Sequence, residues 1–127
     1  MRRTRFDPEQ MLPLTPLSFH ILLALADADR HGYGIIKEVR ERTNGEMNPG
    51  AGTLYAAVQR MLDDGLIAET DDRPAVGDDE RRRYYRLSEI GRQVARAEAL
   101  RLARLIRIAA EKKLIPTPRY AASGGDK

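Results

Sequence analysis

The sequence contains no cysteine and no tryptophan, and it has only two histidines. Without cysteine the chain cannot form disulfides, thiolate zinc sites or a thiol nucleophile. His20 and His31 are too poorly spaced for a zinc site, and His20, which lies in an apolar stretch, is interpreted as a residue at the edge of the core. No nucleophile–base pair, metal-ligand set or phosphate-binding glycine loop is visible, so the sequence indicates neither an enzyme nor a bound cofactor.

Long hydrophobic runs are also absent. The strictly apolar run after His20 extends only from Ile21 to Ala26, far short of the ~18–20 residues that cross a bilayer. Residues 7–10 are polar or proline and interrupt a leader that otherwise imitates a signal peptide. We therefore expect a soluble cytoplasmic protein without membrane contact. At 127 residues, one domain with tails can bury enough surface to fold without a metal or a disulfide.

The net charge of +3 is mild, but the arginines are clustered. Four of them lie within residues 81–86, and three lie within residues 2–5. Such clusters can form an electrostatic footprint on nucleic acid, or they can be an ordinary solvated face. Charge alone does not decide between these interpretations.

Residues 49–64 have the pattern of an amphipathic helix. Asn48 is suited to cap it, Pro49 to occupy its first position, and Gly65 to supply a left-handed stop. One helical face is apolar and carries Leu54, Val58, Met61 and Leu62. The other side is open to solvent or to a partner and carries Thr53, Ala56, Gln59, Arg60 and Asp63.

Two strands are predicted after this helix, at 66–70 and 82–87, with a polar loop at 71–80. In the second strand, Tyr85 and Leu87 are expected on one face, and Tyr84 and Arg86 on the other. A helix followed by a basic two-stranded ribbon is a wing arrangement. It offers one element to a DNA major groove and another to the flanking phosphates. The pattern also fits a small α+β core with solvated arginines.

Before this unit, residues 1–13 are predicted to form a flexible basic arm. Thr15 and Pro16 suit the start of a first helix. Its apolar residues are Leu17, Phe19, Ile21, Leu22, Leu23, Leu25 and Ala28. A second helix follows the turn at 31–34 and ends at Asn44-Gly45. Two helices separated by a short glycine-containing turn fit a helix-turn-helix, in which the helix at 49–64 is the recognition helix.

Ser88 is placed to cap a final helix that runs to about Lys113 and stops before Pro116. Its polar face carries Arg101, Arg104, Arg107 and Glu111, and its apolar residues are Ile90, Val94, Ala97, Leu102, Leu105, Ile106, Ile108 and Ala109. This apolar surface is broader than one small domain covers, which predicts a homodimer through the helix. Packing on the first helix within one chain is the alternative, and both can hold on different flanks. Residues 116–127 are predicted to be a disordered tail.

The chain resembles a known family through four short motifs in order. They are His31-Gly32-Tyr33-Gly34-Ile35, Gly52-Thr53-Leu54-Tyr55, Gly65-Leu66-Ile67 and Arg82-Arg83-Tyr84-Tyr85-Arg86-Leu87-Ser88. Over roughly residues 14–95 the chain is similar to the PadR-like transcriptional regulators of the short-chain type. The resemblance implies a mainly α fold with a small two-stranded β wing. A winged helix-turn-helix over residues 14–87 would be followed by one long dimerisation helix over residues 88–115.

The resemblance also suggests which residues contact DNA. By position, Thr53 and Tyr55 fall in the recognition-helix motif, Tyr33 falls near the DNA backbone, and Arg82 and Arg83 fall at the base of the wing. Tyr55 fits phosphate contact and core packing equally. Two more side chains of the recognition helix suit base edges, a glutamine for adenine and an arginine for guanine. The candidate DNA-binding residues are therefore Tyr33, Thr53, Tyr55, Gln59, Arg60, Arg82 and Arg83.

The chain departs from the family pattern in two places. Ala56 stands where members often carry proline, a change that a helix tolerates well. The loop 71–80 carries five acidic residues against Arg73 alone, so its tip is expected to point away from the phosphates. The lack of tryptophan also disfavours a flat stacking platform for drugs at a dimer interface.

The predicted function is a homodimeric repressor that binds an inverted repeat in double-stranded DNA. A small hydrophobic effector could act between the paired final helices, although dimer packing explains the same apolar residues. The alternative function is a winged-helix module for protein–protein contact, with its arginines docking an acidic partner. The sequence does not identify the operator or the regulated genes, and it does not distinguish repression from activation.

Overall fold

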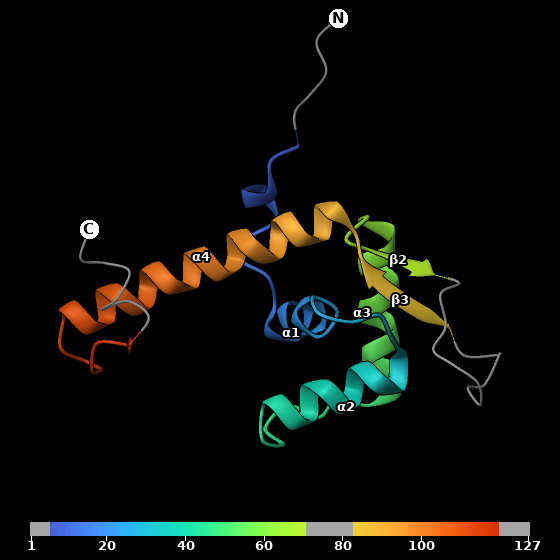
Figure 1. Ribbon diagram of the computed structural model, residues 1–127, viewed down its shortest axis with the longest axis horizontal. Coiled ribbons are helices and arrows are strands. Elements are labelled where there is room, and N and C mark those ends of the chain that lie inside the picture. Colours follow the sequence, from blue (N-terminus) through green and yellow to red (C-terminus); the bar gives the residue numbers. More distant parts are fainter. Residues whose placement is uncertain (1–5, 71–82, 120–127) are drawn as a thin grey trace, which may run out of the picture.

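The computed structural model describes residues 6–70 and 83–119. Within these residues the chain is mainly helical, as predicted, with a small antiparallel sheet. In chain order the elements are η1 (Pro8–Met11), α1 (Pro16–Ala24), β1 (Arg30–His31), α2 (Gly32–Arg42), α3 (Ala51–Asp63), β2 (Ile67–Thr70), β3 (Tyr84–Leu87) and α4 (Glu89–Glu111). Figure 1 shows α4 along the top of the molecule, with α1 and then α2 below it and α3 beside the strands.

The sheet has three strands in the order β1-β3-β2, instead of the two that the sequence predicted. The additional strand, β1, consists only of Arg30 and His31, which lie opposite Tyr85 and Tyr84 of β3. A strand of two residues has no hydrophobic periodicity from which it could be predicted.

The third strand changes the surroundings of β3. Successive side chains of a strand point to opposite faces, yet Tyr84 and Tyr85 are both buried. The ring of His31 meets that of Tyr84 edge-on, with 5.2 Å between the centroids. The predicted alternation between a buried and an exposed face therefore fails at these two tyrosines.

The beginning of α1 agrees with the sequence prediction, but its end does not. Thr15 caps the helix, since its Oγ1 accepts a hydrogen bond from the Ser18 amide at 3.1 Å. The helix ends at Ala24, and Ala28 is exposed instead of belonging to the apolar stripe. Arg30 Nε donates to the Ala24 carbonyl oxygen at 2.6 Å. This bond satisfies one of the acceptors that a helix leaves free at its C-terminus.

The N-terminal segment contains η1, which the sequence did not indicate within the expected arm of residues 1–13. Asp7 accepts a hydrogen bond from the Glu9 amide at 3.1 Å and starts this short helix. η1 packs against α4, far away in the sequence (Figure 1). Part of the predicted arm therefore has a defined place, while residues 1–5 lie outside the described residues.

α3 begins later than the sequence predicted. Its N-cap is Gly50, which makes no side-chain capping bond, and not Asn48 followed by Pro49. Thr43 closes the preceding turn, since its Oγ1 accepts a hydrogen bond from the Met47 amide at 3.0 Å. At the other end, Gly65 has a φ of +78°, which confirms the predicted left-handed stop.

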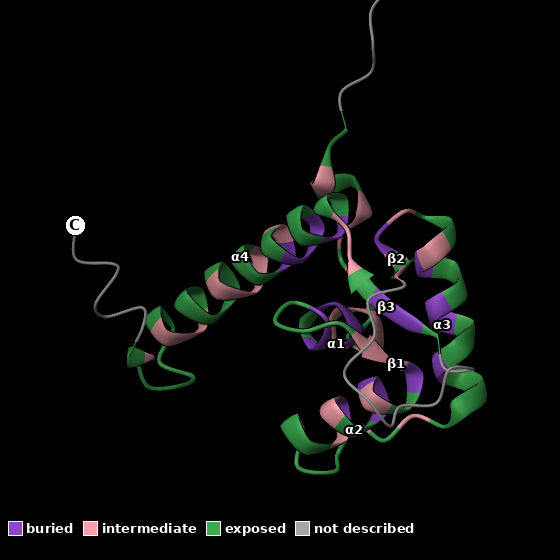
Figure 2. Ribbon diagram, turned by 45° about the vertical axis from the view of Figure 1, so that its right-hand side comes forward, coloured by how far each residue is buried: buried purple, intermediate pink, exposed green. Residues whose placement is uncertain are grey.

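The core lies where α1, α2, α3 and the N-terminal half of α4 meet the sheet. Its fully buried side chains, with the largest volumes, include Ile21, Leu22, Ile35, Val39, Leu54, Val58 and Val94. Figure 2 shows these inner faces as buried and the outer faces of α2 and α3 as exposed. Within residues 6–70 and 83–119, every helix is too short or too polar to span a membrane.

α4 is attached to the sheet at its first turn. Ser88 Oγ accepts a hydrogen bond from the Gly91 amide at 2.9 Å, which confirms the predicted cap, and donates to the Gly65 carbonyl at 2.6 Å. The Ser88 amide donates to the Leu66 carbonyl at 3.1 Å. Gly91 lies so close to the same carbonyl that a Cβ at this position would overlap its oxygen.

We predict that Gly91→Ala lowers the free energy of unfolding by about 1–3 kcal/mol or more, because the new methyl group must displace backbone. Gly52→Ala is the matched control. Gly52 lies in α3 with open space around it, so alanine should be neutral or slightly stabilising there. Urea unfolding followed by circular dichroism measures both changes. Equal stability of the two variants would contradict the close packing of α4 on the sheet.

Candidate nucleic-acid interface

α3 has one buried face and one free face. Leu54, Ala57, Val58 and Met61 point into the core. The exposed residues are Ala51, Gly52, Thr53, Tyr55, Ala56, Gln59, Arg60 and Asp63. This division follows the 3.6-residue helical period and agrees with the sequence prediction. Because the free face lies on the outer side of the domain (Figure 2), a helix in this position can enter a groove without disturbing the core.

Tyr55 combines the two roles that its sequence position left open. It is 46% exposed, so part of the ring is accessible to a ligand. Its hydroxyl also lies against Gly32, where no side chain larger than hydrogen fits unless Tyr55 moves. Tyr55 therefore packs α3 onto the N-terminus of α2 and still contributes to the outer surface.

The N-terminus of α2 presents a second aromatic surface. His31 caps this helix, because its Nδ1 accepts a hydrogen bond from the Gly34 amide at 3.0 Å. Its ring stacks on Tyr33 at a centroid distance of 6.4 Å and also meets the Tyr84 ring edge-on. Tyr33 is 58% exposed, so it can contact a ligand while its neighbour His31 connects it to the sheet.

The base of the wing carries a loosely held cation. Arg83 precedes β3 and pairs with Glu69 of β2 at 3.3 Å, with both side chains largely exposed. Exposed pairs of this kind contribute only about 0–1 kcal/mol, so a phosphate can replace the carboxylate at little cost. Arg82 and the acidic loop 71–80 lie outside the described residues.

Tyr85 of β3 is a buried phenol near α3 and opposite Glu69 of β2. Burial raises the pKa of Tyr85, nearby Tyr55 and Glu69 raise it further, and Arg83 lowers it. Tyr85 therefore stays neutral at physiological pH. Glu69 of β2 lies opposite Tyr85 in the sheet, and Arg83, which pairs with Glu69, directly precedes β3.

The two predicted base-reading residues, Gln59 and Arg60, are both exposed on α3. Gln59 Nε2 donates to Asp63 Oδ1 at 3.1 Å, one turn further along the helix. This bond uses one of the two N–H groups of the glutamine amide, which has a second N–H and a carbonyl oxygen with which to contact a base. Asp63 also places a negative charge on the free face, which opposes close approach of phosphates near the end of α3.

Most of the predicted site residues thus lie on three neighbouring parts of the surface: Thr53, Tyr55, Gln59 and Arg60 on α3, Tyr33 on α2, and Arg83 beside β3. The sequence did not reveal that His31 caps α2 and supports Tyr33. A histidine directly before a helix-starting glycine was the available signal. Within residues 6–70 and 83–119 there is no group of three or more acidic or histidine side chains that could hold a metal ion.

Residues 21–97 match the family model described as Transcriptional regulator PadR-like family. A PadR family transcription regulator of Clostridium difficile R20291 is 29% identical and superposes with a TM-score of 0.64 over 80% of this chain and 100% of that chain. A transcriptional regulator of Clostridium thermocellum is 25% identical, with a TM-score of 0.61 over 75% of this chain and 87% of that one.

Two further similarities are more limited. Bacillus subtilis PadR in complex with operator DNA is 19% identical, with a TM-score of 0.57 over 69% of this chain and 49% of that chain, and indicates the fold. An uncharacterized protein of Lysinibacillus sphaericus, protein X, is 37% identical over 73 residues, 57% of this chain, and the match spans 64% of that relative's length. With its winged helix-turn-helix and the match over residues 21–97, the chain belongs to the PadR-like family of transcriptional regulators, which are not enzymes.

Proposed function

We propose that this protein is a sequence-specific DNA-binding repressor that acts as a homodimer on an inverted-repeat operator. The observation that carries this proposal is the free face of α3, whose Tyr55 contacts the start of α2 near the exposed Tyr33, with the exposed Arg83 beside β3. α3 would enter the major groove, where Gln59 or Arg60 contacts base edges. Tyr33, Thr53, Tyr55, Arg82 and Arg83 would contact the sugar–phosphate backbone and set the register.

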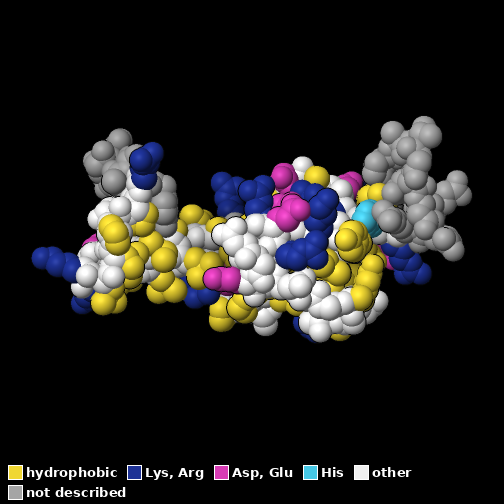
Figure 3. Space-filling model, turned by 90° about the horizontal axis from the view of Figure 1, so that it is seen from below, with side chains coloured by type: hydrophobic (Ala, Val, Ile, Leu, Met, Phe, Trp, Pro, Cys, Tyr) yellow, Lys and Arg dark blue, Asp and Glu magenta, His cyan; other side chains and the backbone are white. Residues whose placement is uncertain are grey.

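The long final helix supports the homodimer. After Glu98, α4 has no buried residue, and it projects beyond α1 in Figure 1. We call residues 99–115 the overhang. Its exposed large apolar side chains are Leu100, Leu105, Ile106, Ile108, Leu114 and Ile115. Figure 3 shows hydrophobic side chains gathered over this part of the molecule. A second copy related by two-fold symmetry would cover them by a self-complementary contact.

Such a dimer would place two recognition helices in successive major grooves, about 34–36 Å apart. A small hydrophobic effector would act near the same helices. A groove of about 390 Å³ runs between α1 and α4, and it is lined mainly by apolar side chains, among them Leu14, Phe19, Leu23 and Leu102. A ligand that changes the packing there would release the operator by changing the distance between the recognition helices.

The proposed function is tested by fluorescence anisotropy on labelled DNA from directly upstream of the protein's own gene, with excess non-specific competitor at physiological salt. We expect a Kd of about 10⁻⁸ M or tighter that survives the competitor. The proposal would be refuted if the protein bound this and other promoters only weakly and if any competitor DNA abolished that binding equally well. The protein–protein docking function would then be the better explanation.

Arg83→Ala should weaken binding to all DNA sequences to the same extent. Removal of one phosphate contact should also lower the slope of log K against log salt by about 1. Arg107→Ala, which removes an exposed arginine from the overhang, is the control and should leave the slope unchanged. The measurement is a salt titration by anisotropy. An Arg83→Ala slope equal to that of the unsubstituted protein would exclude this residue from the phosphate contacts.

The homodimer is tested by Leu105→Glu. Leu105 lies on the continuation of the buried face of α4, and a carboxylate there should be incompatible with a dimer interface. Arg107→Glu puts the same charge on the opposite side of the helix and should leave the dimer intact. Light scattering during size-exclusion chromatography should give twice the 14.3 kDa chain mass for the control and the single-chain mass for Leu105→Glu. If both variants were dimers, the dimer interface would have to lie elsewhere than at Leu105.

A further inference from the structure

Glu98 is the buried charged residue of this fold, with 2% of its surface exposed, and no other charged residue in the described part of the chain is classed as buried. Its carboxylate is fully engaged. Oε1 accepts from Arg101 Nε at 2.6 Å, and Oε2 accepts from Arg101 at 3.1 Å and from the Leu14 amide at 3.0 Å. The hydrogen bonds from Arg101 and Leu14 hold the pKa of Glu98 below its ordinary value although burial opposes them.

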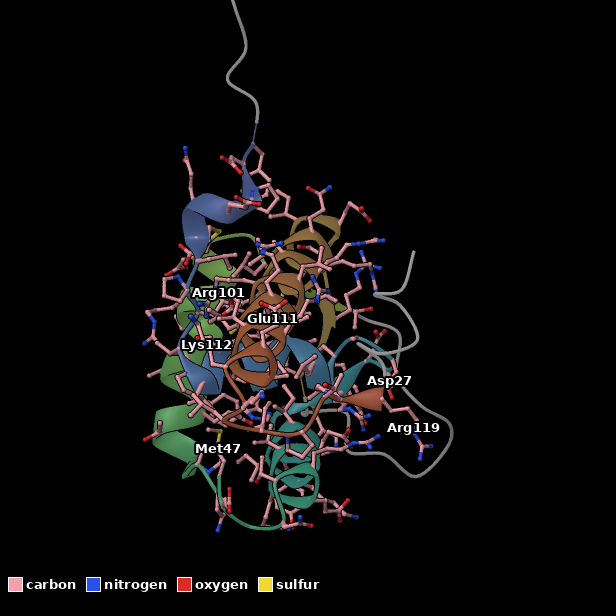
Figure 4. All side chains as sticks on the ribbon, turned by 90° about the vertical axis from the view of Figure 1, so that its left-hand side faces the viewer. Asp27, Met47, Arg101, Glu111, Lys112 and Arg119 are labelled. Carbon is pink, nitrogen blue, oxygen red and sulfur yellow. The ribbon has the colours of Figure 1, made fainter. Side chains whose placement is uncertain are left out.

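The position of Glu98 in the fold is as informative as its contacts. It is the last buried residue of α4, and the overhang that follows borders α1 and η1 only with its first residues, as far as Arg104. Leu14 lies between η1 and the Thr15 cap of α1, so its bond to Glu98 attaches the start of α1 to the middle of α4. η1 packs on α4 as well. Figure 4 looks along α4 and shows Arg101 on the side where the N-terminal segment passes.

A small rotation at this point has a large effect further along the helix. The part of α4 from Glu98 to Glu111 is about 20 Å long at 1.5 Å per residue. A tilt of about 10° at Glu98 therefore displaces its end by about 3 Å, close to the rise of one base pair. If the overhang holds two copies together, this tilt changes the distance between their recognition helices.

Stability alone does not explain a buried carboxylate here. Replacing a buried ion pair by apolar side chains of similar volume is often neutral or stabilising. An apolar contact is not directional, whereas the hydrogen bond from the Leu14 amide joins α4 to the N-terminal segment in a defined direction. The two bonds from Arg101, which lies on α4 as well, hold the carboxylate in place to accept it. The arrangement is therefore suited to fixing an angle.

We propose that Glu98 is a positioning residue which, through Leu14 and Arg101, fixes the direction of the overhang and thereby the half-site spacing that the dimer accepts. The role of Glu98 in fixing the direction of the overhang depends only on the fold. Its role in setting the half-site spacing rests on the proposed function as a homodimeric operator-binding protein.

The direction of the overhang is tested without DNA. The chain has no cysteine, so Asp64→Cys with Lys112→Cys gives one spin label after α3 and one at the end of α4. Pulsed electron paramagnetic resonance on labelled protein diluted with an excess of unlabelled protein measures the distance within one chain. Glu98→Gln keeps an acceptor for Leu14, and Glu98→Leu removes the polar contacts. Glu111→Gln, on the exposed end of α4, is the control.

We expect one narrow distance distribution for the unsubstituted protein and for Glu111→Gln. Glu98→Leu should broaden the distribution or shift its mean by about 3 Å or more, and Glu98→Gln should do so to a smaller extent. Circular dichroism checks that each variant is folded. Folded Glu98→Leu and Glu98→Gln proteins with the distribution of the unsubstituted chain would overturn the positioning role.

The half-site spacing is tested on operators in which one or two base pairs are inserted or deleted between the half-sites. The unsubstituted protein should prefer one spacing by at least roughly fivefold, the effect of one mismatched base pair. Glu98→Leu should lose most of this preference while binding an isolated half-site equally well. A retained preference would overturn the spacing role. Absence of specific binding by the unsubstituted protein would overturn the proposed function together with the spacing role, and the distance measurement would still decide the role of Glu98 within the chain.

Discussion

Ser88, which follows β3, is joined to three other parts of the fold by three hydrogen bonds. Its hydroxyl donates to the carbonyl of Gly65, which ends α3, and accepts from the amide of Gly91 in α4, while its own amide donates to Leu66 before β2. The end of α3, the start of β2 and the first turn of α4 are therefore joined at one point. Because Gly91 has no side chain, α4 can approach the Leu66 carbonyl closely enough for these bonds to form. The relative placement of the candidate interface and the overhang depends on this junction.

The parts of the fold that follow from local patterns could be predicted from the sequence. Thr15 and Ser88 were recognisable as caps, and the buried face of α3 follows from the spacing of its apolar residues. The parts that depend on distant contacts could not be predicted. β1 exists only because β3 lies beside it, and η1 is held by its packing on α4. The start of α3 was placed too early, because Asn48 and Pro49 have suitable residue types but lie before its Gly50 cap.

The candidate site also has features that local sequence patterns predict and features that they do not. Helical periodicity was sufficient to place Gln59 and Arg60 on the free face of α3, and the family resemblance pointed to Tyr33 and Tyr55. Neither could reveal that Gln59 is bonded to Asp63. The burial of Glu98 involves contacts with a separate segment of the chain, whose Leu14 amide it binds. Such contacts leave no periodic signal in a single sequence.

The contact between Tyr55 and Gly32 packs α3 closely against the start of α2. A contact that already forms when the chain folds lowers the conformational entropy that would otherwise be lost on binding. The same contact limits how the protein can evolve. Any side chain introduced at Gly32 would displace Tyr55 from its place on α2, so a mutation outside the recognition helix would alter the surface that this helix presents. New binding preferences are thus more accessible through the exposed residues of α3 than through changes in the angle between the two helices.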